Sequence, residues 1–373
     1  MRKIIIYILF LCLFPTSCNR GGRGIYFPFD GERKIVRIDE MRRFNNVVEI
    51  IPDEFIIERR YIKLHSTEEN FLFGDIAKIR IVNDKIFIFD DWRMSLLVFD
   101  RYGFSKAKIG SRGQGPNEYL NITDFDVDSR GNIYKIDGTL DRLFVYNPDF
   151  SVQSVRALPF EASILHIIDD DRIMFGLSTW NRGNNAGASI IITDRDLNTL
   201  EVLAYHTRYF DNRVIVSCYS FVRTGSHIIY HRPINNNILL FSKEGVLEKI
   251  VDVDFGRRAV RNRDKMNIQR NLRNFDSYNL LQWITIVDCN FMIGTFWESR
   301  ETKSFFIDKT RNEMFVSNST IRGDRGRVAG FDDGTLIQVL VPGLERTKEG
   351  DLSQDIIKHL ANGDFALRLT QLK

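Results

Sequence analysis

Aromatic and cationic side chains recur together in the polar segments that separate the apolar runs of this chain. The tryptophans are Trp92, Trp180 and Trp297, and the arginines are Arg93, Arg142, Arg182, Arg232 and Arg300. An indole ring stacks on sugar rings or apolar groups, and a guanidinium group binds carboxylates, sulfates or carbonyl oxygens. The set predicts a binding face for a glycan, a peptide or a protein. The competing interpretation is that the tryptophans pack between neighbouring elements while the arginines are solvated or pair with nearby acidic side chains.

The histidines do not suggest a metal centre. Only His166 lies in a segment expected to be innermost in the fold, and Arg80 and Thr285 occupy the matching positions of two other segments. A catalytic metal needs several ligands that converge on one point. We therefore predict no metal site and no cofactor. The sequence also lacks a Gly-x-Ser-x-Gly phrase and a constellation of paired carboxylates, so no catalytic residue is predicted.

A glycine-rich segment joins the first two groups of apolar runs. Its residues of interest are Gly110, Gly113, Gly115, Pro116, Glu118 and Tyr119. Glycine permits backbone angles with positive φ, and proline fixes the direction in which the chain leaves. A phosphate cradle would need a helix to begin here, whereas apolar residues typical of a strand follow. We therefore predict a structural crossing in which Glu118 accepts backbone N–H groups.

A basic segment, Phe255–Gln282, stands out for its length. It contains seven lysines and arginines, with apolar Ile268, Leu272 and Phe275 at helical spacing. We expect an amphipathic helix that packs on the rest of the fold with its basic side in solvent. The alternative is a basic lip over a channel, which would favour an anionic ligand.

These segments lie between short apolar runs that repeat along the chain. The first copy begins with Ile76–Val82, the turn Asn83–Asp84 and then Lys85–Asp90. Copies lie near residues 76–110, 123–158, 163–205, 218–253, 283–317 and 326–373. Runs of this length rich in Ile, Val, Phe and Tyr are typical of strands, and four such strands in each repeat are typical of a propeller blade. The sequence predicts an all-β fold, a six-bladed β-propeller of four-stranded antiparallel blades.

The sixth copy is one strand short. It contains a segment with helical periodicity, residues 351–361, before its last apolar run, Phe365–Leu372. Another apolar run, residues 55–64, precedes the first copy and belongs to no blade. Pairing these two runs would complete the sixth blade and leave no strand edge open. We therefore predict that the propeller occupies residues 55–373 and that its ring is closed by both ends of the chain.

Propeller geometry gathers the predicted binding residues on one face. If the strands of a blade are named a to d from the axis outward, the b-to-c and d-to-a connections lie on the same face. The b-to-c segments are residues 91–95, 138–142, 179–187, 232–237 and 297–301. They contain the tryptophans and arginines named above, and the glycine-rich and basic segments are d-to-a connections. We therefore expect a loop-rich binding face.

The N-terminal residues indicate export. Residues 1–17 combine basic Arg2 and Lys3 with an apolar run of eleven residues, which is typical of a signal peptide. Pro15, Thr16 and Ser17 directly precede Cys18, an ending that resembles a bacterial lipoprotein signal, although Pro15 stands where such signals usually carry an aliphatic residue. We predict that Cys18 is diacylated and holds the protein on a membrane through this lipid. Secretion without a lipid is the first alternative, and an uncleaved N-terminal anchor is the second. Residues 18–54 are then expected to be a tether and a lead-in to the propeller.

The charge balance argues against a nucleic-acid partner. The chain has 52 basic and 49 acidic residues, and removal of the predicted signal peptide leaves 50 and 49, a formal charge of +1. A protein that binds nucleic acid through phosphate contacts usually carries a clear basic excess. We expect no nucleic-acid binding, and we expect a monomer.

Two segments resemble a known family. Ile109–Leu120, with the sequence Ile-Gly-Ser-Arg-Gly-Gln-Gly-Pro-Asn-Glu-Tyr-Leu, and the following Phe125–Asp128 are similar to a phrase in six-bladed, NHL-like propeller lipoproteins of Gram-negative cell envelopes. The ending Asn362–Leu369 is also similar, although Phe365 stands where the family pattern has proline. The resemblance implies an outer-membrane lipoprotein. Residues 19–24 lack the acidic run that resembles a surface-export signal, which favours the periplasmic side over the cell surface.

Six-bladed propellers of this general type also include hydrolases and lyases. From the loops and the absence of a ligand ring, we expect a non-catalytic envelope lipoprotein that binds a glycan, a peptide or a protein on its loop-rich face. The alternative is an NHL-like propeller hydrolase or lyase that acts at the axial channel.

Overall fold

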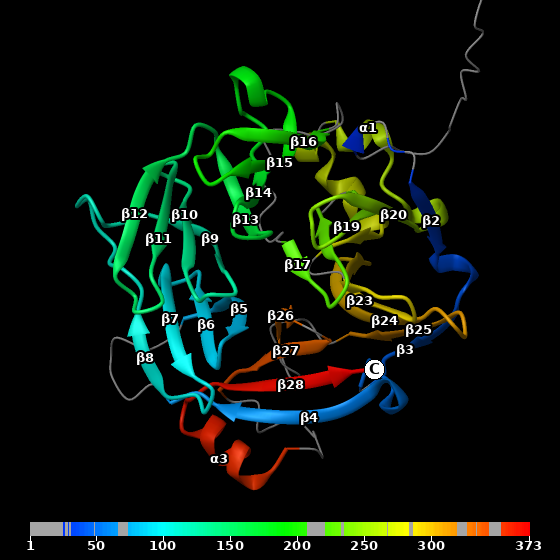
Figure 1. The fold of residues 1–373 in the computed structure, drawn as a ribbon. Helices are drawn as coiled ribbons and strands as arrows, with labels where there is room; N and C mark the ends of the chain where they lie inside the picture. Colours follow the sequence, from blue (N-terminus) through cyan, green and yellow to red (C-terminus); the bar gives the residue numbers. More distant parts are fainter. Residues whose placement is uncertain are drawn as a thin grey trace, which may run out of the picture.

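Six antiparallel sheets surround a common axis in the computed structural model (Figure 1). The structure describes residues 25–26, 29, 31–47, 49–65, 74–206, 221–232, 235–266, 268–282, 286–318, 327–332, 334–342 and 352–373. The predicted signal peptide and Cys18 lie outside the described residues. Within those ranges, no helix has the length and apolar character that a membrane crossing requires.

The first three blades follow one another along the chain. Blade 1 consists of β5 (Ile76–Val82), β6 (Lys85–Asp90), β7 (Ser95–Asp100) and β8 (Ser105–Lys108). Blade 2 consists of β9 (Ile122–Val127), β10 (Ile133–Asp137), β11 (Arg142–Tyr146) and β12 (Val152–Ala157). Blade 3 consists of β13 (Ala162–Ile167), β14 (Arg172–Leu177), β15 (Ala188–Asp194) and β16 (Thr199–His206), with a 3-10 turn, η4 (Gly183–Asn185), before β15.

The other three blades complete the ring. Blade 4 consists of β17 (Phe221–Arg223), β18 (Ile228–His231), β19 (Asn237–Phe241) and β20 (Leu247–Asp254). Blade 5 consists of β21 (Leu280–Leu281), β22 (Ile286–Val287), β23 (Phe291–Glu298), β24 (Glu301–Asp308) and β25 (Glu313–Ser317), with β21 and β22 both paired to β23. Blade 6 consists of β26 (Arg327–Asp332), β27 (Thr335–Leu340), β28 (Ala366–Leu372) and β4 (Ile56–Lys63). The predicted six-bladed propeller is confirmed.

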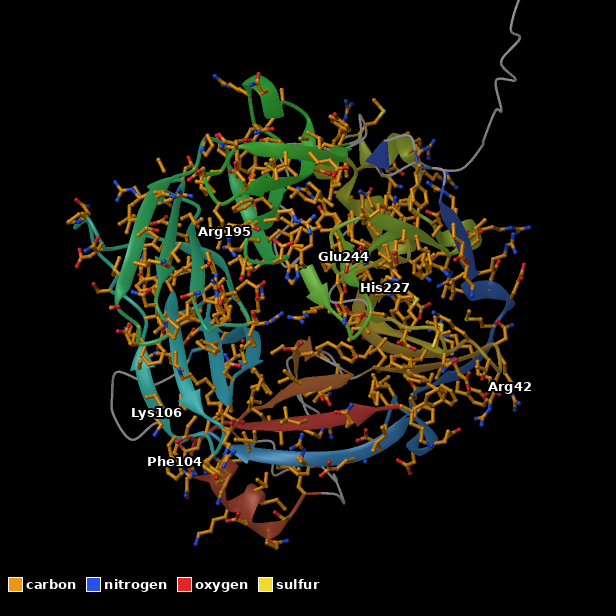
Figure 2. All side chains as sticks on the ribbon, viewed as in Figure 1. Arg42, Phe104, Lys106, Arg195, His227 and Glu244 are labelled. Carbon is orange, nitrogen blue, oxygen red and sulfur yellow. The ribbon has the colours of Figure 1, made fainter. Side chains whose placement is uncertain are left out.

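Apolar side chains pack between neighbouring blades, and Figure 2 shows side chains filling these spaces. Phe89 of blade 1 meets Phe125 of blade 2 edge-on, with ring centroids 6.4 Å apart. Met174 of blade 3 and Phe241 of blade 4 belong to one buried cluster. Each large apolar side chain contributes roughly 1.5–3 kcal/mol when it is fully buried. Because each blade is covered on both faces by its neighbours, a strand such as β6 is apolar at all four interior positions, 86–89, rather than at alternate ones.

The ring closes as the sequence predicts. β4 pairs antiparallel with β28, from Ile56 opposite Leu372 to Lys63 opposite Ala366. The chain ends beside this pair (Figure 1). The expected helix is α3 (Gln354–Ala361), whose first turn is capped because the Ser353 hydroxyl accepts the Ile356 N–H at 3.3 Å. The sixth blade therefore depends on strands that are more than 300 residues apart in sequence.

The N-terminal segment differs from the tether and lead-in that the sequence suggested. Its strands are β1 (Ile25–Tyr26), β2 (Glu32–Arg37) and β3 (Arg42–Asn45), with 3-10 turns η1 (Ile38–Glu40) and η2 (Asp53–Phe55). They add an outermost strand to blades 3, 4 and 5: β1 pairs antiparallel with β16, while β2 and β3 pair in parallel with β20 and β25. We call the described residues 25–26, 29 and 31–46 the N-terminal arm. It runs along the rim of the propeller (Figure 1) and leaves those outer strands with a paired edge.

The basic segment between blades 4 and 5 is not one amphipathic helix. It contains the short helices α1 (Asn262–Lys265) and α2 (Ile268–Asn271), with 3-10 turns η5 (Gly256–Arg258) and η6 (Leu272–Ser277). Helices of one turn have little stability of their own. Packing holds them instead: Ile268 is buried, and Phe275 lies against a buried cluster that includes Tyr278.

Candidate binding face

A buried carboxylate fixes the b-to-c loop of blade 1. Asp90, at the end of β6, accepts the backbone N–H groups of Trp92 at 3.0 Å and Arg93 at 2.9 Å. It also accepts those of Gly74 at 2.6 Å and Asp75 at 3.2 Å, which belong to the chain entering the blade. Asp90 therefore ties the loop to the neighbouring entry segment. A carboxylate with this many backbone donors stays ordered without solvent.

The same arrangement recurs in the next blades. Asp137, at the end of β10, accepts N–H groups from Thr139 and Leu140 of its own loop and from Leu120 of the entering chain at 2.6 Å. In blade 3 an amide takes this place: Asn181 accepts the Glu161 N–H at 2.8 Å and donates to the Glu161 carbonyl at 2.7 Å. These contacts were not predicted from the sequence, although Asp90 and Asp137 each end an otherwise largely apolar strand.

The braced loops of blades 1 and 3 each display a tryptophan and an arginine. The Trp92 residue is 79% exposed and Trp180 is 47% exposed. Arg93 and Arg182 are exposed as well. Trp92 is positioned over Gly74, since a Cβ atom at Gly74 would lie only 2.4 Å from the indole Cδ1. These four side chains are accessible to solvent, as a binding surface requires.

In blade 5 the tryptophan packs against a neighbouring segment, as the competing interpretation of the tryptophans predicts. Trp297 is not in a loop but in β23, where it is half-buried and its Nε1 donates to the Phe275 carbonyl at 3.1 Å. The basic segment covers this indole, so it serves packing. Arg300 lies in the two-residue turn after β23 and pairs with Asp276 of the same segment at 2.8 Å.

Arg232 and Arg142, the other two arginines predicted to line the binding face, are not exposed on it either. Arg232 is buried rather than exposed, and its Nη1 lies 3.0 Å from Nδ1 of His206. Burial and the neighbouring Arg232 lower the pKa of His206 to about 4. Arg142 is half-buried at the first position of β11, opposite Ala157. Sequence spacing alone could not distinguish these positions from Arg93, because burial at each loop depends on the segments that lie over it.

The glycine-rich crossing has the structural role that its composition suggests. Glu118 accepts the Gly115 N–H at 2.8 Å, as expected. Gly113 packs directly on the Glu118 carboxylate, because a Cβ at this glycine would clash with it. Gly110 has φ of 70° and lies against the Tyr146 hydroxyl. Tyr119 is fully buried, whereas Pro116 is exposed in the turn that follows Gly115.

A buried lysine fastens this crossing to blade 2. The Nζ of Lys135 donates to the Ile109 carbonyl at 3.1 Å and to the Tyr146 hydroxyl at 3.0 Å, and it lies 3.8 Å from the centre of the Tyr119 ring. Burial lowers the pKa of Lys135 to about 7. The lysine has no accessible surface, so it supports the loop and does not reach a ligand.

Charged side chains on the innermost strands connect blades near the axis. Asp124 on β9 accepts Lys78 of blade 1 at 2.7 Å and the Leu165 N–H of blade 3 at 3.0 Å. Asp126, two residues along β9, lies 2.9 Å from Nδ1 of His166 and 3.5 Å from Nε of Arg80. Inward-facing positions on one strand are two residues apart, which explains the spacing.

The electrostatics of this axial cluster reflect its burial. Burial raises the pKa of Asp124 despite the neighbouring Lys78. Burial acts in the same direction on Asp126, but Arg80 and His166 outweigh it and lower its pKa. Arg80 also lies 3.9 Å from Asp332 of blade 6. Among the residues that the structure describes, no group of three or more His, Cys, Asp or Glu side chains could hold a metal ion.

Comparison with known proteins agrees with this architecture. A family model described as DUF5128, 6-bladed beta-propeller, matches residues 30–326. The chain belongs to this DUF5128 family. The match begins at the N-terminal arm, so the family pattern includes the strands β2 and β3 on the rim. Among curated proteins, none matches the sequence.

Solved structures extend the likeness of this DUF5128 propeller at the level of fold. A Bacteroides fragilis protein described as exported is 17% identical, with a TM-score of 0.69, and the alignment covers 91% of this chain and 100% of that one. A DUF4221 member from Bacteroides vulgatus is 10% identical with a TM-score of 0.47, covering 85% and 97% of the two chains. Virginiamycin B lyase from Staphylococcus aureus is 9% identical with a TM-score of 0.45, covering 84% and 99%. At these identities all three likenesses concern the fold alone.

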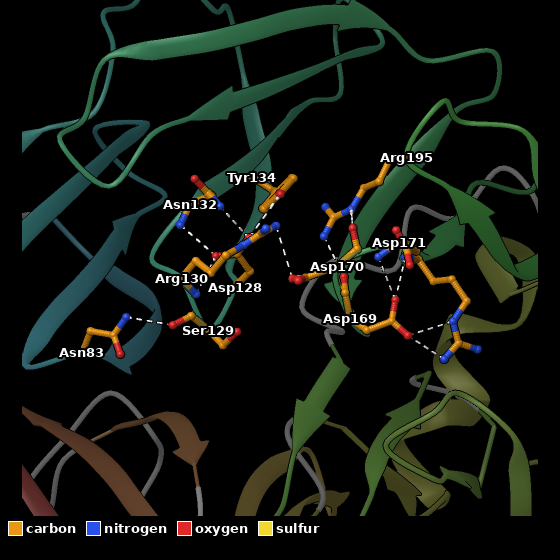
Figure 3. A network of polar contacts seen from close by, with 11 residues as sticks. Asn83, Asp128, Ser129, Arg130, Asn132, Tyr134, Asp169, Asp170, Asp171 and Arg195 are labelled. Atoms are coloured by element: carbon orange, nitrogen blue, oxygen red, sulfur yellow. Dashed lines mark hydrogen bonds and ion pairs between the residues drawn. The ribbon is translucent and has the colours of Figure 1, made fainter.

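On the opposite face of the DUF5128 propeller, the turns of blades 1, 2 and 3 contact one another (Figure 3). Asn83 of blade 1 donates to the Ser129 carbonyl of blade 2 at 2.9 Å. Arg130 of blade 2 pairs with Asp170 of blade 3 at 3.2 Å, and Arg195 donates to the Asp170 carbonyl at 2.7 Å. Polar groups there bind one another across blades, in contrast to the exposed tryptophan and arginine pairs on the other face.

Proposed function

We propose that this protein is a non-catalytic binding protein of the cell envelope that takes its ligand on the b-to-c face. One observation carries the proposal: blades 1 and 3 each present an exposed tryptophan beside an exposed arginine on a braced loop, Trp92 with Arg93 and Trp180 with Arg182. A rigid indole platform stacks on a sugar ring, and a neighbouring guanidinium binds a carboxylate or sulfate. This chemistry favours an acidic glycan over an uncharged one, and a peptide or protein is the alternative ligand.

The location in the envelope is part of the proposal. It is supported by the signal-like residues 1–17 and by Cys18, which would carry the lipid. The fold is shared with a Bacteroides fragilis protein that is described as exported. We propose attachment to the outer membrane, on its periplasmic side.

Binding measurements on the mature domain test the proposal. The domain is titrated calorimetrically with acidic and neutral glycans and with peptides. Replacement of both Trp92 and Trp180 by alanine is expected to weaken binding of an acidic glycan at least tenfold. Tyr102→Ala is the matched control, because Tyr102 is a 62% exposed aromatic residue that follows Arg101 on the c-to-d turn of blade 1, on the opposite face. Unchanged binding in the double variant would refute the proposed surface.

The enzymatic alternative rests on the axial cluster. His166 and Asp126 form an imidazole–carboxylate pair of the kind that general acid–base chemistry uses. Both are almost fully buried, and Asp126 is already engaged by Arg80 and the Ile167 N–H. A stoichiometric metal in the purified domain that is lost in His166→Ala would favour a lyase or hydrolase over a binding protein.

A further inference from the structure

A pocket of about 850 Å³ lies where the N-terminal arm passes from blade 4 to blade 5. Three segments form its walls: the arm, the chain leaving β20, and the end of the sheet of blade 5. Pockets of several hundred Å³ are the size that holds small-molecule ligands. The pocket has none of the tryptophan and arginine residues of the proposed b-to-c surface in its lining, so it is a separate site.

A buried carboxylate surrounded by cations lies in this pocket. Glu298 accepts Nη1 of Arg43 at 2.8 Å, with Nη2 on its other oxygen, and it accepts Nζ of Lys303 at 3.0 Å and Nδ2 of Asn279 at 3.2 Å. Burial alone would raise the pKa of Glu298, but the hydrogen bonds from Arg43 and Lys303 lower it to about 2. Glu298 therefore stays ionised at neutral pH and offsets one of the positive charges.

The lining retains an excess of positive charge. Arg43, Arg257, Arg258 and Lys303 face two acidic residues, Asp39 and Glu298, so the net charge is +2. Arg257 and Arg258 are exposed at the mouth, and Arg258 comes no closer than 3.9 Å to Glu298. Asn45, Ser299 and Asn318 add neutral polar groups to the lining. Two arginines near an open, polar cavity are suited to a carboxylate, which they bind through paired N–H groups.

We propose that this pocket binds a small hydroxylated carboxylate, such as a uronic acid unit, between Arg257 and Arg258 at the mouth and the amide and hydroxyl groups of the wall. Arg43 and Asn45 belong to β3 of the arm, which pairs with β25. A ligand that bridges the arm and the propeller stabilises their contact by mass action. Binding therefore also holds the arm on the rim.

Calorimetric titration of the mature chain with digalacturonate tests the site. Galactobiose is the neutral control, and inorganic sulfate tests the charge alone. Arg257→Ala combined with Arg258→Ala is expected to weaken digalacturonate binding at least tenfold. Arg261→Ala combined with Arg273→Ala removes the same charge from exposed positions of the same segment outside the pocket and is expected to leave binding unchanged. Hydrogen exchange in residues 32–46 is expected to slow when digalacturonate is added.

The outcomes separate this inference from the proposed function. Loss of binding in the Arg257/Arg258 variant, with retention in the Trp92/Trp180 variant, supports the pocket. The reverse pattern places the ligand on the b-to-c face and overturns the pocket while the proposed function stands. Equal weakening in both arginine variants would show general charge attraction, and no binding of either anion to the unaltered chain would also overturn the inference.

Discussion

Nδ1 of His166 lies 2.9 Å from Oδ2 of Asp126, and this contact joins the innermost strands of blades 2 and 3. The same oxygen accepts the Ile167 N–H at 2.9 Å, and the other oxygen faces Arg80 of blade 1. A single carboxylate thus connects the innermost strands of three blades.

Removing this carboxylate is expected to destabilise the whole ring. Asp126→Ala leaves Arg80 buried without its nearest partner and should lower the free energy of unfolding by about 3–5 kcal/mol. Urea denaturation followed by circular dichroism measures the change. Asp196→Ala is the control, because the Asp196 side chain is 82% exposed and pairs only with Arg156 in the contacts described; it should cost less than about 1 kcal/mol. Similar losses in the two variants would contradict the assigned role.

Stability is expected to rise with pH above neutrality because of Lys135. Its pKa is about 7 in the folded protein, against 10.5 for an ordinary solvated lysine. Between these values the unfolded chain holds a proton that the folded protein lacks, so raising the pH favours folding, by up to about 1.4 kcal/mol per pH unit. Unfolding free energies at pH 7, 8 and 9 should therefore rise more steeply for the natural chain than for Lys135→Met. Lys106→Met, at an exposed position, should leave the slope unchanged.

Asp90 is expected to control the order of the Trp92 loop. Asp90→Ala leaves its backbone donors without their acceptor, at a cost of about 1–3 kcal/mol. Hydrogen exchange of the amides of Trp92, Arg93 and Gly74 should accelerate, while amides of blade 4 remain protected. Asp84→Ala, in the exposed a-to-b turn of the same blade, is the control and should not change exchange in this loop. Unchanged protection in Asp90→Ala would show that the loop is held by other contacts.

The N-terminal arm and β4 should differ in how much the folding of the propeller depends on them. Deletion of residues 1–46 removes the arm but keeps β4, so the ring of six blades can still close. That variant should fold cooperatively, with a lower Tm because buried Val36 and Ile38 are lost. Deletion of residues 1–64 also removes β4 and exposes the edge of β28, which should cause aggregation or loss of cooperative unfolding. Size-exclusion chromatography and thermal melts distinguish the two, and equal behaviour would contradict the closure.

Strand patterns made the blades predictable from sequence. β5 and β6 occupy Ile76–Val82 and Lys85–Asp90, as the apolar runs and the turn between them predict. The pairing of β4 with β28 was predictable because residues 55–64 belonged to no repeat, while the sixth repeat, which contains β28, was one strand short. The strands of the arm were not predictable from the sequence. An outermost strand pairs through its backbone, and side chains that face solvent need not be apolar. In β2, Glu32–Arg37, every residue except Val36 is exposed.

The binding face was only partly predictable for a different reason. Trp92 and Trp297 occur near equivalent ends of strand b, yet one is exposed and the other is half-buried under Phe275. What distinguishes them is the basic segment between blades 4 and 5, which blade 1 does not have. Equivalent positions in two repeats are expected to have the same backbone conformation. Whether the side chain at such a position is buried depends on insertions elsewhere in the chain that pack over it.

The order of the arm strands also determines how the propeller would respond to mechanical load. A force applied at the N-terminal end reaches β1 first, then β2 and β3, and only then β4. Each of the first three can detach from the outer edge of one blade without opening the ring. A tethered molecule would therefore lengthen in steps under tension, and the closing pair of β4 and β28 would be the last to bear the load.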